Sequence, residues 1–166
     1  MRCEAALGVA AIAIATVSAC GSGTRGTAPA LPVMTEREWV ENAARFADGL
    51  GVDVLLSADG GSDVATARAA LRDEHALYAM LVAYTAFDDC GRTLADLGPP
   101  ATRLRPVADD LAAACRAFER ASALFSSAVK HSSPDTLLVA TRTTLAASPL
   151  LYGASTQLEA LGAAAR

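Results

Sequence analysis

Alanine is the residue that most constrains the fold of this chain, since it accounts for 39 of the 166 residues. Alanine loses no side-chain entropy in a helix and has the highest helix propensity. Aromatic residues make up only 5% of the chain, and no segment of useful length alternates apolar and polar residues as a half-buried strand does. The composition therefore predicts an all-α protein whose core is built largely from small side chains.

A first helix is indicated directly after residue 34. Thr35 and Glu38 form the Thr-x-x-Glu pattern of a capping box. Apolar residues then recur at steps of three and four as far as Gly49 and Gly51, which we expect to close the helix. The apolar run 52–56 is open to two interpretations: it continues this helix, or it covers the end of a bundle.

A second, long helix is predicted from Ser62 or Asp63 to Leu97, with Gly91 as a soft point. Gly98 followed by two prolines is a strong stop, because glycine adopts a left-handed cap and proline cannot continue the helix.

A third helix is predicted from Pro106 to the region of His131. Ser133, Pro134 and Asp135 open a fourth, in which Pro149 should cause a kink or a split. Because the connections are short, the sequence predicts an antiparallel helical bundle of about four main helices.

Two cysteines fall at matching heights in the predicted hairpin. Cys90 lies eight residues before Gly98, and Cys115 lies nine residues after Pro106. At 1.5 Å per residue, both are about 12–14 Å from the connecting loop. We therefore expect a Cys90–Cys115 disulfide; the alternative is two buried free thiols.

The N-terminal residues have the features of a targeting segment. Residues 5–17 carry no charge, and this apolar stretch is too short for a mature membrane span but suits the core of a signal peptide. It leads into Val17-Ser18-Ala19-Cys20, which resembles the lipobox of bacterial lipoproteins. The resemblance implies that Cys20 receives a diacylglyceryl group and fatty acid such as palmitate, and that 1–19 is removed.

The resulting organisation is a signal peptide over 1–19, a lipidated cysteine with a Gly/Ser/Thr/Pro-rich tether over 20–34, and a helical domain over 35–166. It would place the protein on the outer face of the cell membrane. Two other interpretations stay open: cleavage near Ala19 without lipidation, and an uncleaved anchor. With 13 arginines to one lysine, the chain is similar in style to small secreted helical proteins of GC-rich actinobacteria, a likeness that implies no activity.

The sequence contains no recognisable catalytic motif. Serine-nucleophile elbows, phosphate loops and dinucleotide fingerprints are absent, and no Glu-x-x-His spacing suggests a metal site. Asp88 and Asp89 precede Arg92 at ion-pair spacing. Arg103 and Arg105 flank Leu104 and are candidates for contact with lipid headgroups or a partner. A net charge of −4 gives no overall field for nucleic acid.

We therefore expect a non-enzymatic protein without cofactor or metal: a scaffold, adaptor or accessory subunit for a partner in the cell envelope. The alternative is a binding protein for a small apolar ligand or haem held between helices. His75 and Tyr78, three residues apart on one predicted helix, are the weak candidates for that ligand site.

Overall fold

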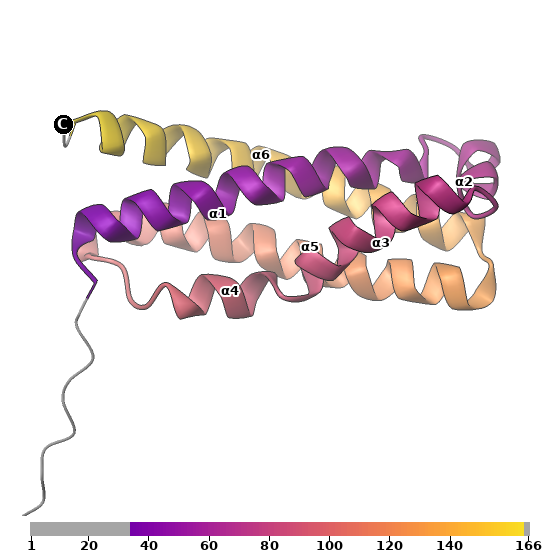
Figure 1. Ribbon diagram of the computed structural model, residues 1–166, viewed down its shortest axis with the longest axis horizontal. Coiled ribbons are helices and arrows are strands. Elements are labelled where there is room, and N and C mark those ends of the chain that lie inside the picture. Colours follow the sequence, from indigo (N-terminus) through magenta and orange to yellow (C-terminus); the bar gives the residue numbers. More distant parts are fainter. Residues whose placement is uncertain (1–33, 165–166) are drawn as a thin grey trace, which may run out of the picture. The chain divides into compact units, whose positions relative to one another are not determined.

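The computed structural model describes residues 34–164, so the predicted signal peptide, Cys20 and all of the tether but Met34 lie outside the described residues. Within this part the chain is all-α, as predicted, with six helices and no strand (Figure 1). The helices are α1 (Glu36–Ser57), α2 (Val64–Ala70), α3 (Glu74–Asp88), α4 (Cys90–Asp96), α5 (Arg105–His131) and α6 (Pro134–Ala164). Short 3₁₀ turns precede α2 (Ala58–Gly60) and α5 (Thr102–Leu104).

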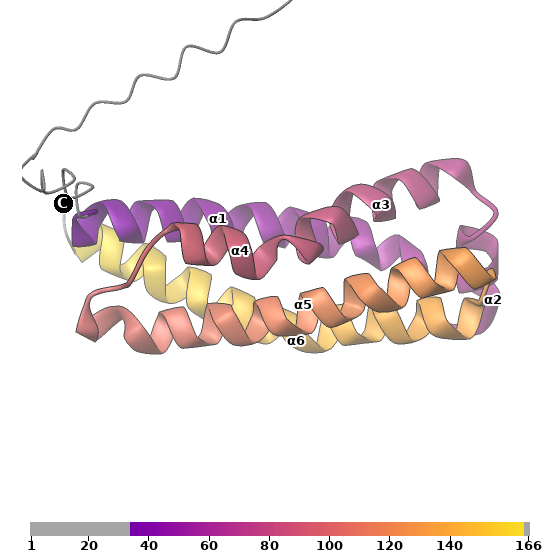
Figure 2. The ribbon, with the colours of Figure 1, turned by 90° about the horizontal axis from the view of Figure 1, so that it is seen from below.

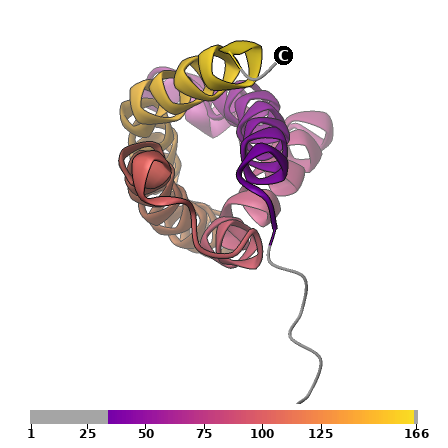
Figure 3. The ribbon, with the colours of Figure 1, turned by 90° about the vertical axis from the view of Figure 1, so that its left-hand side faces the viewer.

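The helices form a closed ring of antiparallel neighbours around one core. Viewed end-on, α1 lies beside α6, α6 beside α5, and α5 beside α3 and α4, while α3 also packs on α1 (Figure 3). Two contacts define the register of α1 and α6: Asp48 accepts a hydrogen bond from Ser155 at 3.2 Å, and Gly51 faces the ring of Tyr152. The prediction of an antiparallel bundle is confirmed, and the short helix α2 closes one end of it (Figure 2).

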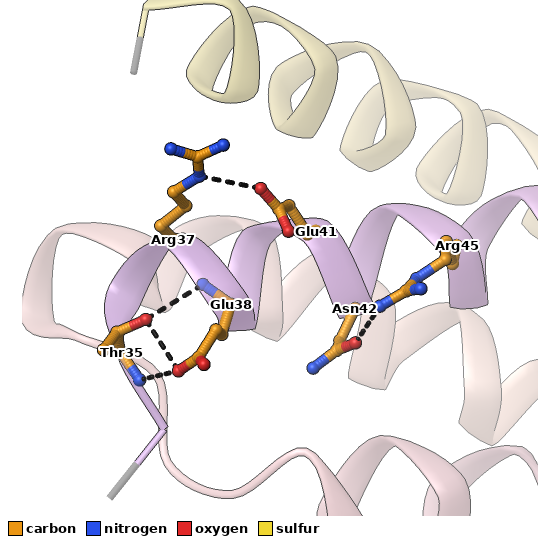
Figure 4. A network of polar contacts seen from close by, with 6 residues as sticks. All are labelled: Thr35, Arg37, Glu38, Glu41, Asn42 and Arg45. Carbon is orange, nitrogen blue, oxygen red and sulfur yellow. Dashed lines mark hydrogen bonds and ion pairs between the residues drawn. The ribbon is translucent and has the colours of Figure 1, made fainter. Parts of the chain in front are cut away.

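The start of α1 has the predicted capping box. The Thr35 hydroxyl accepts from the Glu38 backbone N–H at 3.3 Å, and the Glu38 carboxylate accepts from the Thr35 N–H at 2.8 Å (Figure 4). The Thr35 N–H and the Thr35 hydroxyl both donate to the Glu38 carboxylate and lower the pKa of Glu38, because they favour its charged form. At the other end, α1 continues through 52–56 to Ser57, which resolves the open assignment of that run.

The prediction of one long helix from residue 62 to residue 97 is wrong, because this segment forms α2, α3 and α4. The predicted cap Asp63 does begin α2. A second cap, Asp73, restarts the chain as α3 by accepting from the N–H groups of His75 and Ala76 at 2.9 and 3.0 Å. An aspartate in this role offers the backbone a better partner than a continued helix does.

The second break, at Asp89, depends on a residue from another helix. The Gly91 N–H donates to the Glu119 carboxylate on α5 at 3.0 Å. A Cβ at position 91 would lie 2.4 Å from that carboxylate oxygen, so only glycine permits the approach. The long helix was expected to be weakened at Gly91. The structure shows that Gly91 makes a specific contact with α5.

The remaining helix ends follow the sequence signals. Gly98 adopts a left-handed φ of 74°, and Pro106 lies in the first turn of α5. Ser133 caps α6 by accepting from the Thr136 N–H. Of the two outcomes expected at Pro149, a split does not occur, since α6 is one helix; Leu145, whose carbonyl loses its usual donor, is exposed and open to water.

Aromatic residues concentrate where α3 packs on α5. Tyr84 stacks on Phe125 with ring centroids 4.4 Å apart, and Phe87 stacks on Phe118 at 4.6 Å. The rest of the core relies heavily on alanine, with ten alanines at 0–3% exposure, among them Ala43, Ala114, Ala121, Ala140 and Ala154. The core is thus thin except along α3 and α5.

The predicted Cys90–Cys115 disulfide is present, with the two Cα atoms 5.2 Å apart. Both residues are 1% exposed, and they join the start of α4 to the middle of α5.

We predict that the double variant Cys90→Ala/Cys115→Ala lowers the free energy of unfolding by about 3 kcal/mol, because the bridge closes a loop of 25 residues in the unfolded chain. Urea denaturation followed by circular dichroism measures this. The control is the native chain unfolded with and without reductant, which should reproduce the difference. Equal stability of the variant and the oxidised native chain would contradict the prediction.

Candidate binding surface

The two candidate ligand residues lie on the outside of the bundle. His75 is exposed in the first turn of α3, and Tyr78 is 70% exposed. Neither lines any of the hollows described below. The interior opposite them is filled by the aromatic stack of Tyr84 and Phe125.

Three of the charged candidates, Asp89, Arg92 and Arg103, are paired on the surface. Arg92 forms an ion pair with Asp89 at 2.6 Å, with both side chains largely exposed. Arg103 pairs with Glu36 at the start of α1, while Leu104 between the two arginines is fully buried. No cluster of three or more metal-binding side chains occurs in residues 34–164.

The interior contains two hydroxyls without a partner in the described part of the chain, those of Tyr84 on α3 and Thr141 on α6. Both residues are 1% exposed. Burial raises the pKa of Tyr84, and the nearby hydroxyls of Thr144 and Thr141 oppose this effect. The Thr141 hydroxyl instead faces Gly60, where a Cβ would lie 2.2 Å from it. A larger residue at position 60 would therefore displace the Thr141 side chain.

We predict that Tyr84→Phe raises the free energy of unfolding by about 1 kcal/mol, since it removes a buried hydroxyl that lacks a hydrogen bond and leaves the ring stack intact. Thermal or urea unfolding measures this. Thr144→Val is the matched control, because the Thr144 hydroxyl does donate to the Ala140 carbonyl and its loss should not stabilise. A clear loss of stability in Tyr84→Phe would show that its hydroxyl is bonded.

The outer side of α6 carries few charges, and the sequence pattern did not single it out. Between Asp135 and Glu159, only Arg142 carries a charge. Four large apolar side chains of this helix are 40–50% exposed: Val139, Leu145, Leu150 and Tyr152. Its neighbours α1, α2 and α5 cover the remaining side of α6, and these four side chains stay partly exposed beside those contacts.

Part of this face borders a groove of about 480 Å³ between α5 and α6, which we call the α5–α6 groove. Alanines line the floor of the groove, and each helix contributes one arginine to its lining, Arg120 from α5 and Arg142 from α6. The lining residues are Ala113, Ala117 and Arg120 of α5 with Val139, Arg142, Thr143, Ala146, Ala147 and Leu150 of α6. Neither Arg120 nor Arg142 forms an ion pair with another described residue.

A second groove, of about 530 Å³, lies between the start of α1 and the end of α6. Its floor includes Val40 and Leu158, but its rim is charged with both signs. Four of the charged groups already form the ion pairs Arg103–Glu36 and Arg37–Glu41. This groove therefore presents less unneutralised charge than the α5–α6 groove does.

A third hollow of about 650 Å³ lies beside the disulfide, between α4 and α5. Arg105 lines it, together with Trp39 and Cys115. The Trp39 indole N–H donates to the Gly98 carbonyl at 3.2 Å, which ties α1 to the turn before α5. We interpret this region as structural.

Comparisons of the chain with protein-family models, with curated proteins and with solved structures found no match. Among the described helices, none combines the length and the apolar character that a membrane crossing requires. The function must therefore be inferred from the residues of this chain. The signal that sequence reasoning missed is the scarcity of charge along α6, in a helix expected to have a solvent-facing side.

Proposed function

We propose that this protein is a non-enzymatic adaptor or accessory subunit of the cell envelope, anchored to the membrane through Cys20, which binds another protein through the outer face of α6. The observation that carries the proposal is the outer side of α6, where Arg142 is the one charge between Asp135 and Glu159; Val139 and Leu150 are exposed on one flank, and Leu145 and Tyr152 are exposed on the other. Large apolar side chains that stay exposed along both flanks of one helix are a feature of helices that bind a partner.

The geometry favours this function over a carrier of haem or of a small apolar ligand. A carrier needs a concave site that buries most of its ligand. Stacked aromatic rings occupy the core between α3 and α5, and the hollow that remains beside them is only about 170 Å³. The α5–α6 groove is shallow and opens along the surface of two helices. A shallow groove of this kind suits a protein surface.

We predict that a labelled fatty acid is incorporated into the full chain in the cells that produce it, and that Cys20→Ala abolishes both the label and the processing to a smaller protein. The lipobox at Val17–Cys20 is the reason. Gel mobility and fluorography measure the two effects. Cys3→Ala is the matched control and should be processed normally; an unlabelled native chain would remove the lipid anchor from the proposal.

We predict that the native chain, extracted from membranes in mild detergent, migrates as a complex larger than its own mass, and that Leu145→Asp/Leu150→Asp releases the monomer. Both side chains are exposed, so the substitutions change the surface without burying charge. Val82→Asp, on the exposed side of α3, is the control and should leave the complex intact. A monomeric native chain would contradict the prediction, and one that carries haem with a Soret band, or lipid that is released without breaking the Cys20 linkage, would instead favour the carrier alternative.

A further inference from the structure

The α5–α6 groove has the shape of a helix-docking site. Its floor consists of alanines from both helices, Ala113 and Ala117 on α5 and Ala146 and Ala147 on α6. Small side chains along the seam of two antiparallel helices leave a trough in which the larger side chains of a third helix can interdigitate as ridges in grooves. Val139 and Leu150 lie exposed along the α6 side of the trough. A third helix in this trough would cover the apolar side chains that the bundle leaves open.

The charge of the groove specifies the chemistry of that helix. Arg120 and Arg142 are its only charged lining residues, they come from different helices, and both are exposed without an ion-pair partner among the described residues. A guanidinium pairs with a carboxylate in a specific, often bidentate geometry. Resting on the proposed adaptor function, we propose that the α5–α6 groove binds an amphipathic helix of a partner protein, with an apolar stripe flanked by acidic residues that pair with Arg120 and Arg142.

Two other occupants fit the groove less well. A second copy docked face to face would bring the same arginines together, and like charges at an interface oppose association. An anionic lipid surface also attracts arginine, but helices that bind at a membrane surface present many basic residues beside large apolar ones. The groove offers two arginines above a concave floor of alanine.

The test is site-specific photo-crosslinking of the full chain in the cells that produce it. Benzoylphenylalanine replaces Ala146, which is exposed within the groove, or Tyr78, which is exposed on α3 outside it. We expect the probe at Ala146 to give a protein adduct whose crosslinked peptide, sequenced by mass spectrometry, is an acidic amphipathic helix. The probe at Tyr78 should give no such adduct.

Charge reversal then tests the two arginines. Arg120→Glu/Arg142→Glu should reduce the adduct at Ala146 by about tenfold, from two lost ion pairs and the new repulsion. Replacing the partner's acidic residues by lysine in the same cells should restore it. The matched control is Arg68→Glu/Arg72→Glu, which changes the charge equally at exposed positions outside the groove and should leave the adduct unchanged.

Each other outcome overturns the inference. An adduct of lipid, of a second copy, or of a segment without acidic residues assigns the groove a different occupant. An adduct at Tyr78 alone leaves the adaptor function in place and removes the groove from it. No adduct at either position, together with a monomeric native chain in detergent, contradicts both proposals.

Discussion

The bundle depends on one seam between the α3–α4 segment and α5. Three pairs lie along it in antiparallel register: Tyr84 on Phe125, Phe87 on Phe118, and Cys90 bonded to Cys115. On both sides of the seam these residues recur at steps of three or seven, which places them on one face of each helix. The helix break at Asp89 falls between the second and third pairs, yet the register continues across it. The disulfide therefore continues the α3–α5 contact past the point where the helical backbone hydrogen bonds are interrupted.

The seam determines how α6 is held. While the stacked aromatic rings lie between α3 and α5, α6 packs on its neighbours with four buried leucines and, between them, with small or hydroxyl residues such as Ala140, Thr141 and Ala147. These small residues let α6 lie close to α5 and α1, but they bury little apolar area per residue. The leucines and the valine that α6 also carries are divided between the core and the outside, so a helix without charge over most of its length faces water on one side.

The sequence was sufficient for features that depend on near neighbours. The Thr35–Glu38 box, the left-handed Gly98 and the Pro106 and Pro134 helix starts are local, and the structure has each of them. The disulfide was predictable because, in an antiparallel hairpin, two residues at similar sequence distances from the connecting loop lie at the same level along the helices. The break at Asp89 was not, since it involves Glu119, 28 residues away, whose carboxylate takes the Gly91 N–H. Asp73 is a residue type that favours an N-cap, but the apolar pattern continues across it and suggested an unbroken helix.

The candidate surface was the least predictable feature, for the same physical reason. Arg120 and Arg142 lie on different helices, and the sequence gives no sign that they border a common groove until the register of α5 and α6 is known. The composition does explain why a groove forms between these two helices. Alanine at facing positions such as Ala117 and Ala147 brings two helices together and at the same time removes the side chains that would fill the space above their seam. The alanine content that makes this chain helical thus also makes its core thin and its surface grooved, and a third helix placed in the groove would supply the apolar contacts that the bundle lacks.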